Sequence, residues 1–145
     1  MTISLVGRTA FRLSAVSLCV VGSSACGAAS ALRDTTGPTI VQITTSTKSF
    51  AIDCPPTSVR VSARITDASG VRRAVLRYRV NNNQPYASRN MTVSGHLYRA
   101  SVKGIELPAG PYGALEFYIT AEDASGRSNR SSVDTSVQFL PCVGA

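Results

Sequence analysis

Two segments of this 145-residue chain share one pattern, in which apolar and polar residues alternate and then stop at a tight turn. The alternation runs over residues 58–66, stops at the turn Asp67-Ala68-Ser69-Gly70 and resumes at Val71. Residues 115–122 repeat it and end at Asp123-Ala124-Ser125-Gly126. A period of two predicts strands with one buried face, and a turn containing glycine predicts that the chain reverses there. The pattern therefore predicts stacked β-sheets.

The rest of the chain agrees with this prediction. Turn residues recur every ten residues or so, and no segment shows helical periodicity over three turns. We expect an all-β, antiparallel β-sandwich of about seven strands. The segments expected to form strands are Thr39–Thr44, Ser49–Ile52, Ser58–Thr66, Arg72–Val80, Tyr86–Val93, Leu97–Val102, Leu115–Glu122 and Val133–Phe139.

The last third of the chain carries a family resemblance. Leu107-Pro108-Ala109-Gly110, followed by the alternating segment 115–128, resembles the end of a fibronectin type III or related immunoglobulin-like domain of bacterial exported proteins. The resemblance covers roughly residues 38–142 in strand order and implies an immunoglobulin-like sandwich that serves as a spacer or binding module. Two features depart from the family: Leu115 stands where the corner tyrosine is usual, and the chain has no tryptophan.

The amino terminus has the form of an export signal. Arg8 and Arg12 precede an apolar run over residues 13–22, which has the length of a signal-peptide core and is too short to span a bilayer. We assign residues 1–25 to a signal peptide, 26–37 to a linker, 38–142 to the sandwich domain and 143–145 to a tail. The predicted location is outside the cytoplasmic membrane.

Two alternatives remain for the mature amino terminus. Ser24-Ala25-Cys26 resembles the end of a bacterial lipoprotein box, which would make Cys26 a lipidated first residue anchored to the membrane. Ser23 departs from that box, which usually has Leu or Val there. Ordinary cleavage, after Ala25 or after Ala31, would instead release a soluble secreted protein.

The cysteines fit an exported domain. Cys54 and Cys142 flank the predicted sandwich, and we expect them to form a disulfide bond between its two ends. Cys19 lies in the signal segment, so Cys26 is left over, and lipidation is one explanation for it. A redox or metal role for Cys54 and Cys142 is not favoured, because neither belongs to a CxxC motif and no histidine is near either one.

The charge pattern predicts one basic surface. The formal net charge is +7, but the Lys and Arg residues form no continuous run, which does not favour nucleic-acid binding. Arg60 and Arg64 face outward on one predicted strand, Arg99 and Lys103 on its expected neighbour, and no acid faces out beside them. Spaced like charges on a solvated face are the simplest explanation. The alternative is contact with an anionic wall polymer, lipid headgroups or an acidic partner.

No catalytic constellation emerges from the sequence. His96 is the single histidine and sits beside a predicted turn, so we expect neither a catalytic residue nor a zinc-type metal site. Asp67, Glu122 and Asp123 would lie at one end of the sandwich and could begin a calcium shell. A turn role, in which each aspartate accepts a backbone N–H, explains both Asp-Ala-Ser-Gly copies without an ion and is favoured. We therefore expect no cofactor.

The sequence favours a non-enzymatic function. We predict a binding or accessory module of the cell envelope, whose partner is an unknown protein or an anionic envelope polymer. One alternative is a carbohydrate-binding module, although Tyr78 and Tyr98 fall on inward positions. Another is a small enzyme inhibitor acting through residues 81–85 or 108–113, the two candidate protruding loops.

Overall fold

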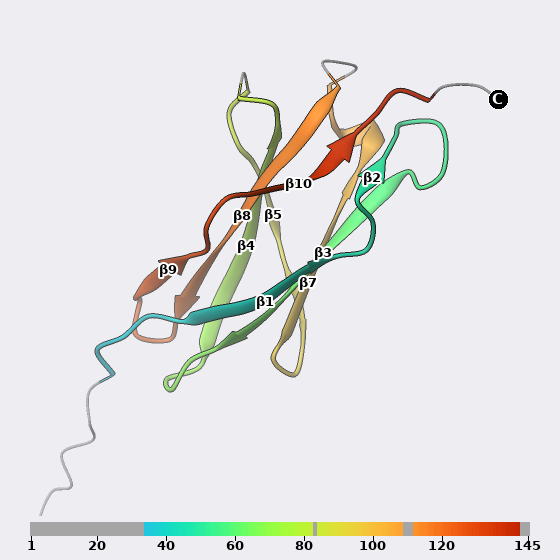
Figure 1. Ribbon diagram of the computed structural model, residues 1–145. Coiled ribbons are helices and arrows are strands. Elements are labelled where there is room, and N and C mark those ends of the chain that lie inside the picture. The colour runs from blue at the N-terminus through green and yellow to red at the C-terminus, as the bar shows by residue number, and fades with distance from the viewer. Residues whose placement is uncertain (1–33, 83, 109–111, 143–145) are drawn as a thin grey trace, which may run out of the picture. The chain divides into compact units, whose positions relative to one another are not determined.

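The computed structural model describes residues 34–82, 84–108 and 112–142, which form two β-sheets stacked face to face (Figure 1). The first sheet has the strand order β1-β3-β7-β6, and the second has the order β2-β10-β8-β4-β5, with β9 paired to β8. The strands of the first sheet are β1 (Thr39–Thr45), β3 (Ser58–Thr66), β6 (Thr92–Ser94) and β7 (Leu97–Lys103). Those of the second are β2 (Ser49–Phe50), β4 (Val71–Val80), β5 (Ala87–Asn90), β8 (Gly113–Asp123), β9 (Ser128–Arg130) and β10 (Asp134–Phe139).

The alternating segments form the strands that build the core. In β3 every second residue from Val59 to Ile65 is completely buried, and Leu115, Phe117 and Ile119 of β8 are completely buried as well. Each sheet therefore turns one apolar face toward the other, as the period of two predicts. The largest fully buried hydrophobic side chains are Phe50, Phe117, Phe139, Ile65, Leu76, Leu115, Ile119, Val59, Val61, Val102 and Val137.

The prediction of an all-β sandwich is confirmed, and so is the predicted pairing of the strand that carries Arg60 and Arg64 with the strand that carries Arg99 and Lys103. β3 pairs antiparallel with β7 from Ser58↔Lys103 to Arg64↔Leu97. β4 pairs antiparallel with β8 along nearly its whole length. Ten strands are present among the described residues instead of about seven, because three of them, β2, β6 and β9, have only two or three residues each.

Two details differ from the expected strands. The segment 86–93 divides at Met91, so that β5 pairs with β4 in the second sheet and β6 pairs with β7 in the first. Met91 is buried and its N–H bonds the carbonyl of Ala74, which holds the crossing point in place. The short strand β2 pairs with β10 in parallel, so the sandwich is not wholly antiparallel.

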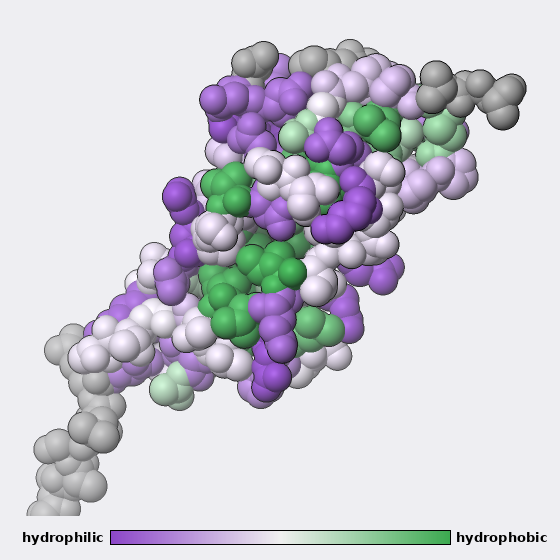
Figure 2. All heavy atoms as spheres, viewed as in Figure 1, coloured by the Kyte–Doolittle hydropathy of each residue, from purple (hydrophilic) through white to green (hydrophobic). Residues whose placement is uncertain are grey.

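The edge of the sandwich near β1 exposes some apolar surface. Figure 2 shows apolar side chains gathered over β1, with hydrophilic ones around them. Val41 of β1 is 42% exposed, whereas Ile40 and Ile43 of the same strand pack partly against the core. This strand is irregular, because its register against β3 shifts between Val41 and Thr44 and Gln42 has a φ of 52°.

The predicted disulfide bond between Cys54 and Cys142 is confirmed. Their Cα atoms lie 5.7 Å apart, although 88 positions separate them in sequence. The bond joins the loop after β2 to the chain just beyond β10, and it fits an extracellular location.

Several predictions fall outside the described residues. These are the signal peptide at 1–25, lipidation of Cys26, most of the linker and the tail at 143–145. The last linker residues, 34–37, are described and contact the domain, since a Cβ on Gly37 would lie 3.1 Å from the Ser128 carbonyl oxygen. Within the described part of the chain, no helix has the length and apolar character needed to cross a membrane.

Candidate functional site

The outer face of the first sheet carries the predicted basic residues. Its four strands contain Arg60, Arg64, Arg99 and Lys103 and not one acidic residue. All four basic residues are exposed, because each occupies the polar positions of an alternating strand. In the described residues none of the four takes part in an ion pair, so this basic face carries uncompensated positive charge.

The register places hydroxyl groups between these cations. Arg60 lies opposite Ser101, and Arg99 lies between Ser62 on β3 and Thr92 on β6. Arginine guanidinium groups with adjacent hydroxyls suit the binding of carboxylate or phosphate oxygens. The basic face thus combines charge with hydrogen-bonding groups.

An open groove of about 320 Å³ runs along one side of the basic face. Arg60 and Arg99 line it from the first sheet, and Arg89 lines it from β5 of the second sheet. Arg89 is neutralised, because its guanidinium lies 2.8 Å from a carboxylate oxygen of Glu106. The sequence did not indicate this pair, since Arg89 lies on β5 whereas Glu106 follows β7, 17 positions further along the chain.

Glu106 belongs to a short 3₁₀ helix, Gly104–Glu106, that follows β7 directly. Burial raises the pKa of its carboxyl, but hydrogen bonds from Arg89 and from the N–H of Lys103 lower it by more. The net result is a lowered pKa, and the same contact raises the pKa of Arg89. Glu106 therefore stays ionised at neutral pH and holds the guanidinium of Arg89 at the groove.

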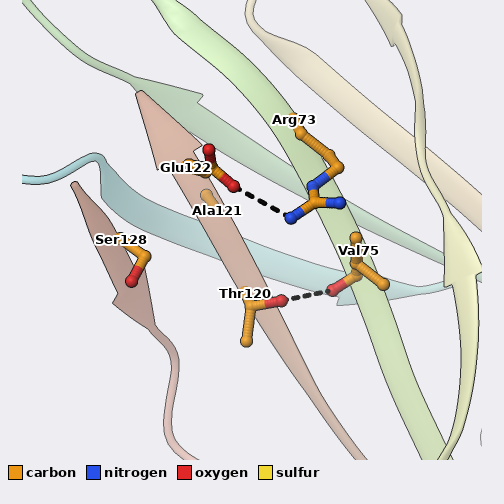
Figure 3. Close-up of a pocket in the computed structure, with 6 residues that line it drawn as sticks. All are labelled: Arg73, Val75, Thr120, Ala121, Glu122 and Ser128. Atoms are coloured by element: carbon orange, nitrogen blue, oxygen red, sulfur yellow. Dashed lines mark hydrogen bonds and ion pairs between the residues drawn. The ribbon is translucent and has the colours of Figure 1, made fainter. Parts of the chain in front are cut away.

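The second sheet presents a different outer face, on which the basic residues are largely paired. Arg79 of β4 contacts Glu116 of β8 at 2.7 Å, and Arg72 and Arg73 both contact Glu122. Figure 3 shows Glu122 reaching across from β8 to Arg73 on β4. These contacts join β4 to β8 through pairs of opposite charge.

The tyrosines do not form a row of free rings. Tyr78 and Tyr98 are buried, as predicted, and burial raises the pKa of Tyr98. Tyr86 and Tyr118 pack edge to face on the second sheet, with ring centroids 4.9 Å apart. The guanidinium carbon of Arg79 lies 4.3 Å from the centroid of the Tyr86 ring, and that of Arg130 lies 4.9 Å from the centroid of the Tyr118 ring. Stacking a sugar on either covered ring face would require these guanidinium groups to move.

The other candidates are placed as follows. His96 is exposed in the turn between β6 and β7, and its carbonyl accepts the N–H of Ile65. The two candidate inhibitor loops meet, since the side-chain amide of Asn81 donates to the carbonyl of Tyr112 at 3.1 Å. Residues 83 and 109–111 of these loops lie outside the described residues.

The two Asp-Ala-Ser-Gly turns adopt the predicted conformation. Oδ1 of Asp67 accepts the N–H of Ser69 at 2.8 Å, and Oδ1 of Asp123 accepts the N–H of Arg127 at 2.7 Å. The turns are neighbours, because the N–H of Ala124 donates to the carbonyl of Gly70. Glu122 points to the opposite side of its strand and pairs with arginines, so it does not join the two aspartates.

Comparison with known proteins adds little to this picture. No protein-family model matches the sequence, and no curated protein matches it. Among solved structures, one similar chain is the crystal structure of a Br derivative of BhCBM56, a carbohydrate-binding module. The two chains share 17% identity with a TM-score of 0.41, over 57% of this chain and 80% of that one. A similarity of this size carries no argument about function, so the function must be inferred from the residues themselves.

Proposed function

We propose that this chain is a non-enzymatic, exported binding module of the cell envelope, and that its basic face binds an anionic envelope polymer. The observation that supports this is the difference between the two outer faces. The first sheet carries four basic residues and no acid. In the second sheet, four arginines on β4 and β5 are paired with glutamates, namely Arg72, Arg73, Arg79 and Arg89. Unpaired charge of one sign attracts a ligand of the opposite sign.

A polymer suits this surface better than a small ligand does. The basic face is spread over two long strands and opens into a shallow groove, instead of converging on one enclosed pocket. A chain with repeated carboxylate or phosphate groups would contact several cations at once. Each contact would be weak and screened by salt, but several linked contacts add up.

The expected class and location are part of the same proposal. The pairings β3–β7 and β4–β8 support an immunoglobulin-like sandwich, because that class places its second strand beside its fifth and its third beside its sixth. The disulfide bond supports export to an oxidising compartment. Domains of this class serve mostly as spacers and binding modules, which agrees with a non-enzymatic role.

The test is a charge reversal on the basic face. The variant Arg60→Glu with Arg99→Glu should lose retention on isolated cell-envelope preparations by at least about tenfold, and wild-type retention should fall as salt rises from about 50 to 500 mM. The matched control is Lys48→Glu with Arg130→Glu, which makes the same change in net charge at exposed positions away from the basic face. Co-sedimentation with the envelope preparation measures the retention of wild type and of both variants.

Three results would contradict the proposal. They are unchanged retention of the Arg60/Arg99 variant, an equal loss in the Lys48/Arg130 control, and retention that does not respond to salt. Binding to a neutral polysaccharide that both variants keep would instead favour the carbohydrate-binding alternative. Specific inhibition of an enzyme, lost on changing residues 81–85, would favour the inhibitor alternative.

A further inference from the structure

Three aspartates from distant parts of the sequence meet at one end of the sandwich. Asp34 precedes β1, Asp67 begins the turn between β3 and β4, and Asp123 ends β8. One carboxylate oxygen from each lies within 4.8 Å of the others. This aspartate cluster is the only group of three or more potential metal-ligating side chains among the described residues.

Hydrogen bonds hold the segments that carry the three aspartates in place. The two turns that carry Asp67 and Asp123 are joined by the hydrogen bond from Ala124 to Gly70. The segment that carries Asp34 is attached to β9, because the side-chain amide of Asn129 donates to the carbonyl of Pro38 at 3.1 Å. The convergence is therefore built into the fold and does not depend on flexible side chains alone.

Asp123 provides an independent indication of a ligand. Its side chain is completely buried, and Oδ1 accepts the N–H of Arg127, but Oδ2 is buried with no hydrogen-bond partner. Oδ2 of Asp34 is also buried and has no partner. Buried carboxylate oxygens are costly unless a donor or a cation satisfies them.

The charges at the aspartate cluster are not balanced by the protein. Within the described residues no Lys or Arg forms an ion pair with Asp34, Asp67 or Asp123. Aspartate carboxyl groups ordinarily carry a negative charge at neutral pH. Three negative groups at this separation repel one another, and a bound cation would remove that repulsion.

The donor set indicates which cation fits. All three side chains offer oxygen and none offers nitrogen or sulfur, which favours a hard cation over zinc or copper. Calcium accepts six to eight oxygens in flexible geometry, and three carboxylates with waters can provide them. We infer that Asp34, Asp67 and Asp123 form a calcium-binding site that joins the segment before β1 to the turns after β3 and β8. In the calcium shell that the sequence offered as the less favoured alternative, Glu122 is replaced by Asp34.

The test is a calcium titration of the full chain after treatment with a chelator. We expect one calcium ion to bind per chain by calorimetry, and the melting temperature to rise by about 10 °C at 10 mM CaCl₂. The variants Asp67→Asn and Asp34→Asn should each lose most of this rise. Asp67→Asn keeps the turn, because the amide oxygen can still accept the N–H of Ser69. Asp34→Asn leaves the sheets unchanged, because Asp34 lies outside every strand.

The matched control is Asp134→Asn, because Oδ1 of Asp134 accepts the N–H of Ser136 at 2.7 Å, the same contact two residues on that Asp67 makes with Ser69, but at the start of β10 and outside the aspartate cluster. This control should keep the full rise. The inference is overturned by a melting temperature that does not respond to CaCl₂, or by an equal response in Asp67→Asn and in wild type. An equal response to MgCl₂ or to NaCl of the same ionic strength would overturn it too. None of these results depends on polymer binding, so the site is tested separately from the proposed function.

Discussion

At the scale of single residues, the two Asp-Ala-Ser-Gly turns show how side-chain chemistry sets backbone geometry. Gly70 and Gly126 have φ values of +86° and +83°, in the left-handed region where a Cβ is unfavourable. The space around each is open, since a Cβ at either position would meet nothing within 4 Å. These glycines are thus required by the backbone and not by packing.

Replacing Gly126 with alanine should destabilise the domain by about 1 kcal/mol, because a left-handed backbone is unfavourable for alanine and its added methyl group makes no new contact. Gly126→Asn should cost clearly less, because asparagine tolerates this conformation. Urea unfolding in the presence of a chelator measures both variants without a contribution from metal. If asparagine proved as costly as alanine, backbone strain would not be the cause.

At the scale of elements, the pair formed by Arg89 and Glu106 links the two sheets at one edge. Arg89 lies on β5 of the second sheet, and Glu106 lies in the 3₁₀ helix that follows β7 of the first. The helix is packed closely on its other side, because a Cβ on its Gly104 would lie 2.8 Å from the carbonyl carbon of Ala51. The element that bears Glu106 therefore has little freedom, and the carboxylate is held in position for Arg89.

The Arg89–Glu106 pair should make part of the stability depend on pH. The folded pKa of Glu106 lies below its ordinary value, so its contribution is complete above the unfolded pKa and is lost as pH falls through the folded pKa. We expect Glu106→Gln to be less stable than wild type at pH 7 by about 0.2–1 kcal/mol, and the difference to shrink as pH falls through the lowered folded pKa. Urea unfolding at a series of pH values measures it.

Arg64→Gln is the control for this comparison, because Arg64 is exposed and takes part in no ion pair among the described residues. Its difference from wild type should change little over the same pH range. A Glu106→Gln difference that grew as pH fell would contradict the assignment.

At the scale of the whole molecule, the disulfide bond closes a long loop. Cys54 and Cys142 are 88 positions apart, so the bond encloses almost all of the core-forming strands from β3 to β10. A cross-link of this span stabilises mainly by restricting the unfolded chain. The bond therefore adds stability to a domain whose single core is small.

Removing the bond by Cys54→Ser with Cys142→Ser should lower the free energy of unfolding by about 4 kcal/mol. Denaturant unfolding under non-reducing conditions measures this change. Wild-type protein with the bond reduced should unfold at nearly the same denaturant concentration as the double variant. A double variant as stable as oxidised wild type would show that the cross-link does not restrict the unfolded state.

The local pattern alone was enough to predict the strands and their turns. The alternation at residues 58–66 and 115–122 depends only on which side of its strand each residue faces. The glycines at 70 and 126 are required by the positive φ of a single turn, which is also a local property. The Cys54–Cys142 bond also followed from the sequence, because these two cysteines flank the predicted domain and the other two lie in the amino-terminal segment. The positions of Arg60, Arg64, Arg99 and Lys103 on one face followed from the same alternation.

Only the tertiary structure decided which distant residues meet. It divided the segment 86–93 at Met91 between two sheets, brought Arg89 to Glu106, and put Asp34 beside Asp67 and Asp123 in place of Glu122. Alternation indicates which side of its own strand a residue faces. It does not indicate where a connecting segment crosses between sheets or where the chain before the first strand is attached, because those depend on how the two sheets stack. Both proposed binding surfaces thus combine residues set by local pattern with residues placed by long-range packing.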